Sequence, residues 1–297
     1  MISTPGRLGD DDLRAVAALE ERVVAVDGGR LKLDRDGMRD RPDGAVEDFL
    51  WWQDDQLVGY LGFDTWGGRS IELAGMVDPA ARGRGIGTAL LAAALRQCRG
   101  RDLEQALLIV PRPSEAGHRT ARRAGATPSH AEHALVLRER PAPGPVDPRT
   151  TLRRATAADV PALTAVLTEA FGRPPHDLAA VVAAPGDRTL VVEVDTEPVG
   201  TVRLTREHLE GRPAGGVYGF AVAPRAQGRG VGRDVLRRVS AQLFDEGLDR
   251  VGLEVAVENE RALGLYTSVG FAPVSTEDYY SLPLGLSAAA PGARAAT

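Results

Sequence analysis

The sequence has little of what disulfide-bonded, zinc-binding or membrane proteins require. Of its 297 residues only Cys98 is a cysteine, which excludes an intramolecular disulfide and a metal cluster built on thiolates. The five histidines form no HxH or HxxxH pair, and no apolar stretch approaches the roughly 20 residues of a membrane span. Asp10, Asp11 and Asp12 stand where a signal peptide would need an apolar core. We therefore expect a cytoplasmic protein without a metal or a membrane partner.

Lysine is nearly absent, since Lys32 is the only one among 36 basic residues, and we attribute this to coding bias rather than to a function of arginine. Against 41 acidic residues the basic ones leave a formal charge of −5, which argues against nucleic acid as a partner. With 43% hydrophobic and 26% charged residues, the composition is that of a folded globular chain. The length favours two domains.

A glycine-rich segment occurs twice in the chain. Val77–Gly87 (VDPAARGRGIG) recurs as Val222–Gly232 (VAPRAQGRGVG), at an offset of 145 residues. Upstream, Asp54–Gly59 (DDQLVG) matches Asp195–Gly200 (DTEPVG). The same landmarks in the same order predict a tandem duplication. We divide the chain into a first domain at 1–140, a proline-rich linker at 141–149, a second domain at 150–286 and a disordered tail at 287–297.

The second half gives the clearer pattern of elements. Thr156–Asp159 has the form of a capping box that opens a helix, and Asp195–Pro198 separates two β-branched runs as a hairpin turn does. Strands are expected at 152–154, 189–194, 199–205, 217–222, 251–257 and 279–284, and helices at 156–171, 231–243 and 262–269. This order predicts an α/β fold, an α+β unit with a mixed sheet.

Each copy of the repeat runs from a strand into a glycine-rich loop and then into a helix. Glycines allow backbone conformations closed to other residues and let a ligand approach the main chain. The loop N–H groups and the positive end of the helix form an anion site that suits a phosphate or diphosphate. Charge-assisted contacts can come from Arg82, Arg84, Arg229 and Arg233. For a single copy, a tight turn is the alternative. A dinucleotide fingerprint does not fit, because the third glycine comes one residue early and the loop follows a hairpin.

The second half also carries a downstream motif. The segment PRAQGRGVG at 224–232 is followed by Asn259-x-x-Ala262-x-x-Leu265-Tyr266-x-x-x-Gly270-Phe271. Together the motifs resemble the GNAT superfamily of acyl-CoA-dependent N-acyltransferases, well over 150–284, and over 1–138 through the hairpin and loop only. The resemblance implies a tandem duplication of the GNAT fold, with acetyl-CoA as co-substrate. Two such halves are similar in architecture to the mycothiol synthases, although the ending Tyr279–Leu284 (YYSLPL) is not typical of them.

The resemblance also locates the coenzyme. In the family, the strand before the loop bulges and splays from its neighbour, and the pantetheine arm pairs with the freed backbone. By motif position, the implied coenzyme contacts are Phe220, Ala221, Val222, Gln227, Gly228, Arg229, Gly230, Val231, Gly232, Arg233 and Asn259. The repeat implies Met76, Val77, Arg82, Gly83, Arg84, Gly85, Ile86, Gly87 and Thr88 in the first half. The Val222 N–H is expected to stabilise the tetrahedral oxyanion.

The resemblance makes Tyr266 the general acid, whose phenol would protonate the departing thiolate. Helical spacing alone would make Tyr266 a core residue instead. The general base stays open, because Ala214–Val217, where many relatives carry a glutamate, has no carboxylate. Possible substitutes, perhaps through a bridging water, are Glu193, Glu254, Glu210 and His208. Glu254 is equally readable as an outward residue of an alternating strand.

The first half lacks these groups. At the offset of 145, Asn259 corresponds to Ser114, Tyr266 to Ala121 and Phe271 to Ala126, and alanine cannot protonate a thiolate. We expect a degenerate, non-catalytic first domain that keeps an acyl-CoA-shaped pocket, although Glu72 leaves residual activity open. The remaining expectations are an edge or broken strand at Pro111 and Pro113, at least one core residue among Trp51 and Trp52, and a buried Cys98.

The predicted activity is transfer of an acetyl group from acetyl-CoA to a primary amine, by direct attack in a ternary complex in the second domain. The acceptor is expected to be a small molecule or a peptide, and the protein a monomer or a homodimer. Two alternatives stay open: acetylation of a cysteinyl amine, as by mycothiol synthase, and a non-catalytic acyl-CoA sensor. Tyr266 and Asn259 argue against the sensor.

Overall fold

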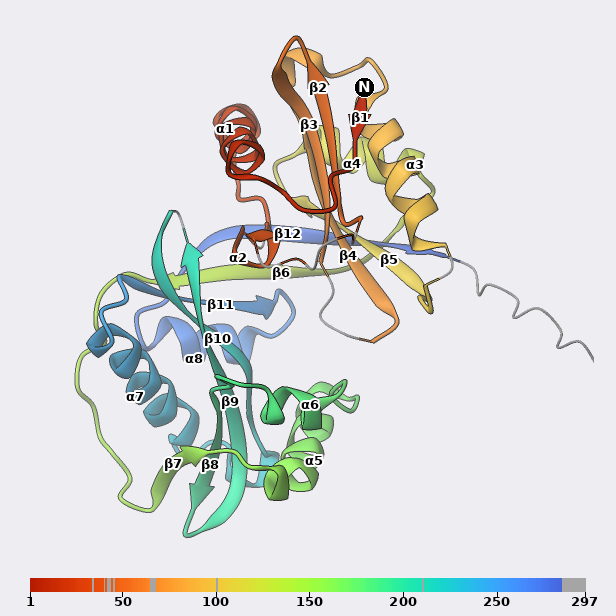
Figure 1. The fold of residues 1–297 in the computed structure, drawn as a ribbon. Helices are drawn as coiled ribbons and strands as arrows, with labels where there is room; N and C mark the ends of the chain where they lie inside the picture. Colours follow the sequence, from red (N-terminus) through yellow and green to blue (C-terminus); the bar gives the residue numbers. More distant parts are fainter. Residues whose placement is uncertain are drawn as a thin grey trace, which may run out of the picture. The chain divides into compact units, whose positions relative to one another are not determined.

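The computed structural model describes residues 1–284 except 34, 40, 42, 43, 45, 65–67, 100 and 210. The expected tail at 287–297 and the candidate base Glu210 lie outside the described residues. The chain forms two compact units (Figure 1). Unit 1 comprises the described residues of 1–130 together with 277–284, and unit 2 comprises Ala131–Thr276.

Unit 1 is a sheet with helices on both faces. Its helices are α1 (Asp10–Asp27), α2 (Arg35–Arg39), α3 (Ile86–Cys98) and α4 (Glu115–Arg123), with a 3-10 turn η1 (Pro79–Ala81). Its strand order is β1 (Ile2–Ser3), β2 (Asp48–Gln53), β3 (Gln56–Asp64), β4 (Ser70–Val77), β5 (Gln105–Pro111) and β12 (Ala272–Pro283). Tyr60 and Met76 pack with α1, whereas Leu61 and Leu73 pack with α3. This alternation gives the unit two cores, one on each face of the sheet.

Unit 2 repeats the pattern. Its helices are α5 (Val160–Phe171), α6 (Leu178–Ala183), α7 (Val231–Asp245) and α8 (Glu260–Thr267), with 3-10 turns η2 (Ala157–Asp159) and η3 (Pro224–Ala226). Its strand order is β6 (Thr127–Leu137), β11 (Arg250–Ala256), β10 (Arg212–Val222), β9 (Glu197–Leu209), β8 (Thr189–Val194) and β7 (Thr150–Arg154). Strands β10 and β11 run parallel, whereas the other neighbouring strands of this unit pair antiparallel. The sheet is therefore mixed, as expected. In Figure 1, α5 and α6 lie on one side of β9 and β10, and α7 on the other.

The two units exchange strands. Residues 132–137 of β6 pair with β11 in unit 2, and residues 277–283 of β12 pair with β5 in unit 1. The compact units therefore do not end at the expected boundaries of 140 and 150, and the expected strand at 279–284 joins the sheet of the other half. The pairing of β12 with β5 also makes β5 an interior strand, because β5 pairs with β4 on its other side. The expectation of an edge strand is therefore wrong. Strand β5 nevertheless ends at Pro111.

Local signals explain the elements that the sequence predicts. Asp54 and Asp55 in one hairpin, and Asp195 and Thr196 in the other, have positive φ, as two-residue hairpin turns require. The Thr156–Asp159 capping box is present: the Asp159 carboxylate accepts bonds from the Thr156 N–H and hydroxyl, both at 2.8 Å. Both hairpins and the start of α5 thus follow from local sequence.

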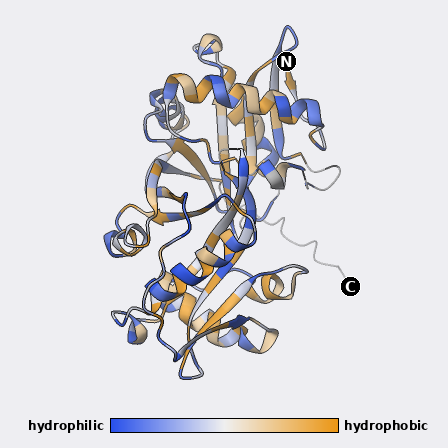
Figure 2. Cartoon of the chain, turned by 90° about the vertical axis from the view of Figure 1, so that its left-hand side faces the viewer, coloured by the Kyte–Doolittle hydropathy of each residue, from blue (hydrophilic) through white to orange (hydrophobic). Residues whose placement is uncertain are grey.

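The cores account for the remaining aromatic and sulfur-containing side chains. Trp51 packs against the core on the α3 side, and Trp52 against the core on the α1 side, because adjacent residues of a strand face opposite ways. Cys98 is buried at the end of α3, and burial raises the pKa of its thiol. Its side chain therefore fills space in the core and is not a reactive thiolate. Figure 2 shows the helices banded in hydrophilic and hydrophobic colours, as expected when one side packs on a sheet.

Candidate coenzyme and active site

Both glycine loops adopt the backbone that the repeat predicts. Gly83 and Gly85 have φ of +77° and +82°, and Gly228 and Gly230 have φ of +77° and +85°. A Cβ added at any of the four would meet no atom within 4 Å, so the positive φ, and not crowding, is what favours glycine there. Helices α3 and α7 begin directly after the loops. Their first N–H groups lie next to the loop N–H groups, an arrangement that can accept an anion.

The strands before the loops split from their parallel neighbours. In unit 2 the β10–β11 pairing ends at Gly216–Gly252, and β10 carries a bulge between Tyr218 and Ala221, with Gly219 at φ +53°. In unit 1 the β4–β5 pairing ends at Ala74–Ile109, while β4 stays in continuous register with β3. Each unit has the split, and unit 2 also has the bulge.

The split exposes a backbone N–H in unit 2. The Ala223 N–H donates to the Val199 carbonyl of β9 at 2.7 Å. Successive peptide groups of a strand point to opposite sides, so the Val222 N–H points away from β9, toward the split. The Gln227 Nε2 donates to the Val222 carbonyl at 2.6 Å, and this carbonyl points away from β9 like the N–H of the same residue.

Arg82 occupies the same place in unit 1. Its Nε donates to the Val77 carbonyl at 3.1 Å, as Gln227 does to Val222, and its two terminal nitrogens bond to Asp27 at 2.7 and 2.9 Å. Arg82 and Gln227 therefore hold the end of the strand against the loop. Arg84 and Arg229 are exposed on the two loops, where their side chains can contact an anion. The Arg233 Nε donates to the Ser268 hydroxyl at 3.0 Å.

A cavity of about 420 Å³ opens above the split in unit 1. It is lined by Met76, Val77, the loop from Gly83 to Thr88, and α4. At the offset of 145, Gly75, Thr120 and Ala121 stand where unit 2 has Phe220, Leu265 and Tyr266. A Cβ added at Gly232 would lie 3.3 Å from Leu265 and 3.8 Å from Phe220, so these larger side chains crowd the corresponding space in unit 2. Smaller residues thus leave the cavity in unit 1.

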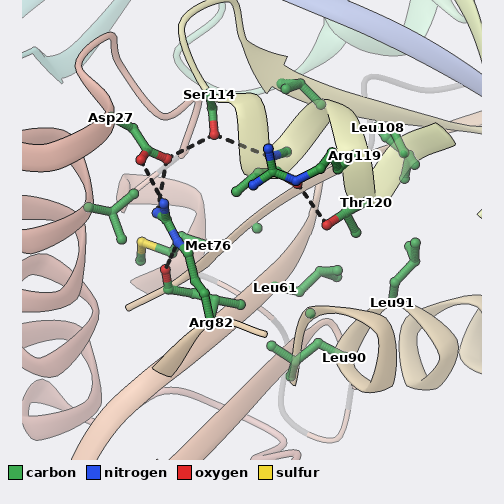
Figure 3. Close-up of a pocket in the computed structure, with 18 of the residues that line it drawn as sticks. Asp27, Leu61, Met76, Arg82, Leu90, Leu91, Leu108, Ser114, Arg119 and Thr120 are labelled. Atoms are coloured by element: carbon green, nitrogen blue, oxygen red, sulfur yellow. Dashed lines mark hydrogen bonds and ion pairs between the residues drawn. The ribbon is translucent and has the colours of Figure 1, made fainter. Parts of the chain in front are cut away.

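The unit 1 cavity has a polar side and an apolar side (Figure 3). Asp27 bonds to Arg82 and accepts a bond from the Ser114 hydroxyl at 2.9 Å. Ser114 also caps α4, and Arg119 and Arg123 of this helix line the same cavity. The apolar side is formed by Leu61, Leu73, Leu90, Leu91 and Leu108. An elongated ligand with an apolar part and an anionic part suits this lining.

Tyr266 lies on α8, the helix that follows β11, and β11 is one of the two strands that separate at the unit 2 split. It is 8% exposed, and its ring lies 6.5 Å from that of Phe220 and 6.3 Å from that of Phe271. Burial raises the pKa of the phenol to about 12, so Tyr266 carries its proton at neutral pH. Within the described chain, no group hydrogen-bonds to this hydroxyl. The side chain therefore packs in the core and still presents an unpaired donor.

Asn259 and the candidate bases take different places. The Asn259 Oδ1 accepts a hydrogen bond from the Ala262 N–H at 3.1 Å and caps α8, as Ser114 caps α4.

The candidate bases lie in different parts of the structure. Glu193 is paired with Arg153 at 2.8 Å and accepts from the Thr151 hydroxyl, so it belongs to the β7–β8 surface. Glu254 lies on β11, two residues past Gly252 and on the same face. The geometry brings Glu254, and not Glu193, to the split. In unit 1, Glu72 is paired with Lys32 at 3.5 Å.

The pair that holds Glu193 gives a stability prediction. The Asp159 carboxylate bonds to both terminal nitrogens of Arg153 at 2.7 and 2.8 Å, and these bonds hold the pKa of Asp159 well below its usual range. A lowered folded-state pKa stabilises the fold above the unfolded-state value of about 4, and this contribution is lost as pH falls. We expect Asp159→Asn to lower the free energy of unfolding by about 1.5–3 kcal/mol at pH 7 and by less in acid.

Urea unfolding at pH 7 and pH 3 measures this difference. Asp147→Asn is the matched control, because Asp147 pairs with Arg149 at the exposed surface and should leave the unfolding midpoint unchanged. An equal loss of stability for Asp159→Asn at both pH values would show that the carboxylate charge is not the cause.

The structure also shows two polar residues that the sequence reasoning missed. The Tyr218 hydroxyl donates to Glu207 Oε2 at 2.8 Å, and both side chains lie on the face of the sheet opposite α7. Alternation along β9, with Leu204 in the core and Thr205, Glu207 and Leu209 on the other face, was the signal that could have found Glu207. Its proximity to the split depends on how β9, β10 and β11 are registered.

No group of three or more His, Cys, Asp or Glu side chains suited to a metal ion occurs in the part of the chain that the structure describes. None of the helices in that part is long and apolar enough to cross a membrane.

The chain belongs to the acetyltransferase (GNAT) family, whose model matches residues 16–126 and again 160–271. It is therefore an acyltransferase, and the two matches confirm the tandem duplication. The chain is 31% identical to the mycothiol acetyltransferase of Mycobacterium marinum, covering 93% of this chain and 95% of that protein. It is also 33% identical to the aminoglycoside N(6')-acetyltransferase type 1 of Stenotrophomonas maltophilia, which covers 46% of this chain and 96% of that protein.

Solved structures share the fold. A GCN5-related N-acetyltransferase from Sphaerobacter thermophilus superposes with a TM-score of 0.73 at 20% identity, covering 96% of this chain and 95% of that one. A tandem GNAT protein from the clavulanic acid biosynthesis pathway superposes with a TM-score of 0.64 at 18% identity, covering 96% and 99%. The expected tandem GNAT fold is confirmed.

Proposed function

We propose that the protein transfers an acetyl group from acetyl-CoA to a primary amine of a small molecule or peptide, in a ternary complex in unit 2. The observation that carries this proposal is the position of Tyr266: a buried, protonated phenol without a protein partner, beside a split sheet and an anion-binding loop. The Tyr266 oxygen is not fully enclosed, so a ligand can reach it and accept its hydrogen bond. Asn259, Phe220 and Ala221 border the same split.

The proposed reaction uses backbone and side-chain groups in turn. Loop residues 227–233 hold the diphosphate, and the Val222 N–H stabilises the oxyanion formed when the amine nitrogen attacks the thioester carbonyl. The new C–N bond replaces the C–S bond, the nitrogen of the neutral primary amine loses one of its two protons, and Tyr266 gives one proton to the thiolate. With a pKa of about 12, Tyr266 is a weaker acid than a thiol, so it donates a strong hydrogen bond to the developing thiolate and releases its proton only as the nitrogen gives up its own.

Unit 1 is proposed to bind the coenzyme without transferring its acyl group. The cavity, the loop at 83–88 and the backbone of Met76 and Val77 supply the binding groups. Ala121 supplies no proton, since a methyl group stands in the place of the Tyr266 phenol.

The acceptor is proposed to be an amine on a sugar-linked small molecule. The relatives favour this class: the mycothiol acetyltransferases match almost the whole chain, and an aminoglycoside acetyltransferase matches half of it. Acetylation of a cysteinyl amine is the narrower form of the proposal. Residues Tyr279–Pro283 of the ending pair with β5 in unit 1, so we take the ending to bear on architecture and not on the acceptor.

The proposal is tested by measuring release of the coenzyme thiol from acetyl-CoA with a panel of primary amines. The panel includes a sugar-linked cysteinyl amine, an aminoglycoside and an N-terminal peptide amine, and mass spectrometry checks for the N-acetyl product. We expect amine-dependent turnover with at least one sugar-linked amine. Tight binding of acetyl-CoA without turnover of any amine would instead support the sensor alternative.

A further inference from the structure

We infer that Glu207 is the proton acceptor for the amine substrate, although it lies on β9 and not on the strand before the glycine loop. This inference rests on the proposed function of unit 2. The search for a carboxylate in Ala214–Val217 fails because this segment has none. The structure supplies a carboxylate to that place from the neighbouring strand.

The carboxylate of Glu207 lies over the point where the sheet splits. A Cβ added at Gly216 would be 3.0 Å from Glu207 Oε1, and a Cβ added at Gly252 would be 3.5 Å from the same oxygen. Gly216 and Gly252 are the last residues that pair β10 with β11. Glu207 Oε1 therefore borders the space that a side chain at 216 would fill, beside the vertex of the split.

Two glycines make this placement possible. At Gly216, a Cβ would overlap the Thr205 hydroxyl and the Tyr218 ring, and at Gly252 it would overlap the Leu209 side chain. Neither glycine has positive φ, so their backbone conformations do not require glycine. Their role is to leave room on this face of the sheet for Glu207 and its neighbours.

Tyr218 is a positioning residue for Glu207. Its hydroxyl donates to Oε2 at 2.8 Å, which turns Oε1 toward the two glycines. Thr205, next to Gly216, has a buried hydroxyl without a hydrogen-bond partner among the described residues. A buried polar atom without a partner is unfavourable and marks a place where a ligand group can bond. The acceptor amine is inferred to meet the Glu207 carboxylate on this face of the sheet.

An acceptor that arrives as an ammonium ion loses two protons in the reaction. The nitrogen gives its first proton to Glu207, which releases it to solvent after the reaction. As the C–N bond forms and the C–S bond breaks, the nitrogen loses a second proton, which restores the one that Tyr266 gives to the thiolate. One amide, one thiol and one proton in solution result.

Glu207→Gln tests this role, and Glu254→Gln tests the rival carboxylate on the same face. We expect Glu207→Gln to lower kcat/KM about 100-fold and to move the acidic limb of its pH profile toward the pKa of the free amine. The dissociation constant for acetyl-CoA, measured by calorimetry, should stay the same. Tyr218→Phe should lower kcat/KM about 10-fold and move the same limb in the same direction, because the carboxylate is less well oriented.

The outcomes separate this inference from the proposed function. Wild-type kcat/KM and an unshifted acidic limb in Glu207→Gln would overturn the inference and leave the proposed function intact, and a larger loss in Glu254→Gln would assign the role to Glu254. Failure of the wild-type protein to acetylate any amine would overturn both. A Glu207→Gln protein with an unchanged melting temperature shows that the loss of rate is not a loss of fold.

Discussion

Replacement of Tyr266 by phenylalanine is expected to lower kcat by about 10²–10⁴ and to leave the dissociation constant of acetyl-CoA nearly unchanged. The phenol contributes when negative charge develops on the sulfur, so its loss raises the barrier without weakening the ground state. Steady-state kinetics with the best amine, together with calorimetric titration of acetyl-CoA, measure the two quantities separately.

The environment of Tyr266 supplies the controls. Its hydroxyl has no hydrogen-bond partner among the described residues, so Tyr266→Phe should keep or slightly raise the free energy of unfolding. With a pKa of about 12, the phenol should cause no fall in kcat between pH 8 and about 10 in the wild type. An unchanged kcat in Tyr266→Phe would remove this residue from the mechanism and reduce it to the core residue that helical spacing suggests.

Gly230→Asp is expected to weaken acetyl-CoA binding to unit 2 by about 10³-fold and to bring turnover to background. A carboxylate at this position faces the diphosphate seat, and juxtaposed like charges cost several kcal/mol. Aspartate tolerates the positive φ of this residue, since Asp54, Asp55, Asp177 and Asp195 all adopt it in this chain. The fold should therefore survive, because aspartate is also a favourable residue at the start of a helix.

Gly230→Asn is the matched control, since asparagine tolerates the same backbone and lacks the charge. It should keep far more affinity than the aspartate variant. Gly85→Asp applies the same change to unit 1, where Gly85 has φ +82°. If both units bind the coenzyme, the wild type takes two equivalents and each aspartate variant takes one, with turnover lost only in Gly230→Asp. Loss of turnover in Gly85→Asp instead would place the chemistry in unit 1.

The distribution of volume differs between the units. Unit 1 has a cavity because Gly75, Thr120 and Ala121 are small, and unit 2 has Phe220, Leu265 and Tyr266 packed at the corresponding positions. The sequence comparison of the halves found Ala121 as a missing acid. Only the packed structure showed that the same substitutions change the space available to a ligand.

The sequence by itself determined the parts of this protein that depend on neighbouring residues. Both hairpins, the capping box at Thr156, the helices after the loops and the positive φ of Gly85 and Gly230 follow from short motifs, because turn and cap geometry is set within a few residues. The repeat predicted the duplication, and the motif around Tyr266 placed the chain in its family.

Tertiary structure decided what depends on distant residues. The exchange of β6 and β12, the bonding of Arg82 to Asp27 and the placement of Glu207 above Gly216 and Gly252 each join segments far apart in the chain. An alternating pattern shows which side chains share a face, and the register between strands decides which of them meet. The alternation along β9 indicates which face carries Glu207, but the register that brings its carboxylate beside Gly216 is set by the tertiary structure.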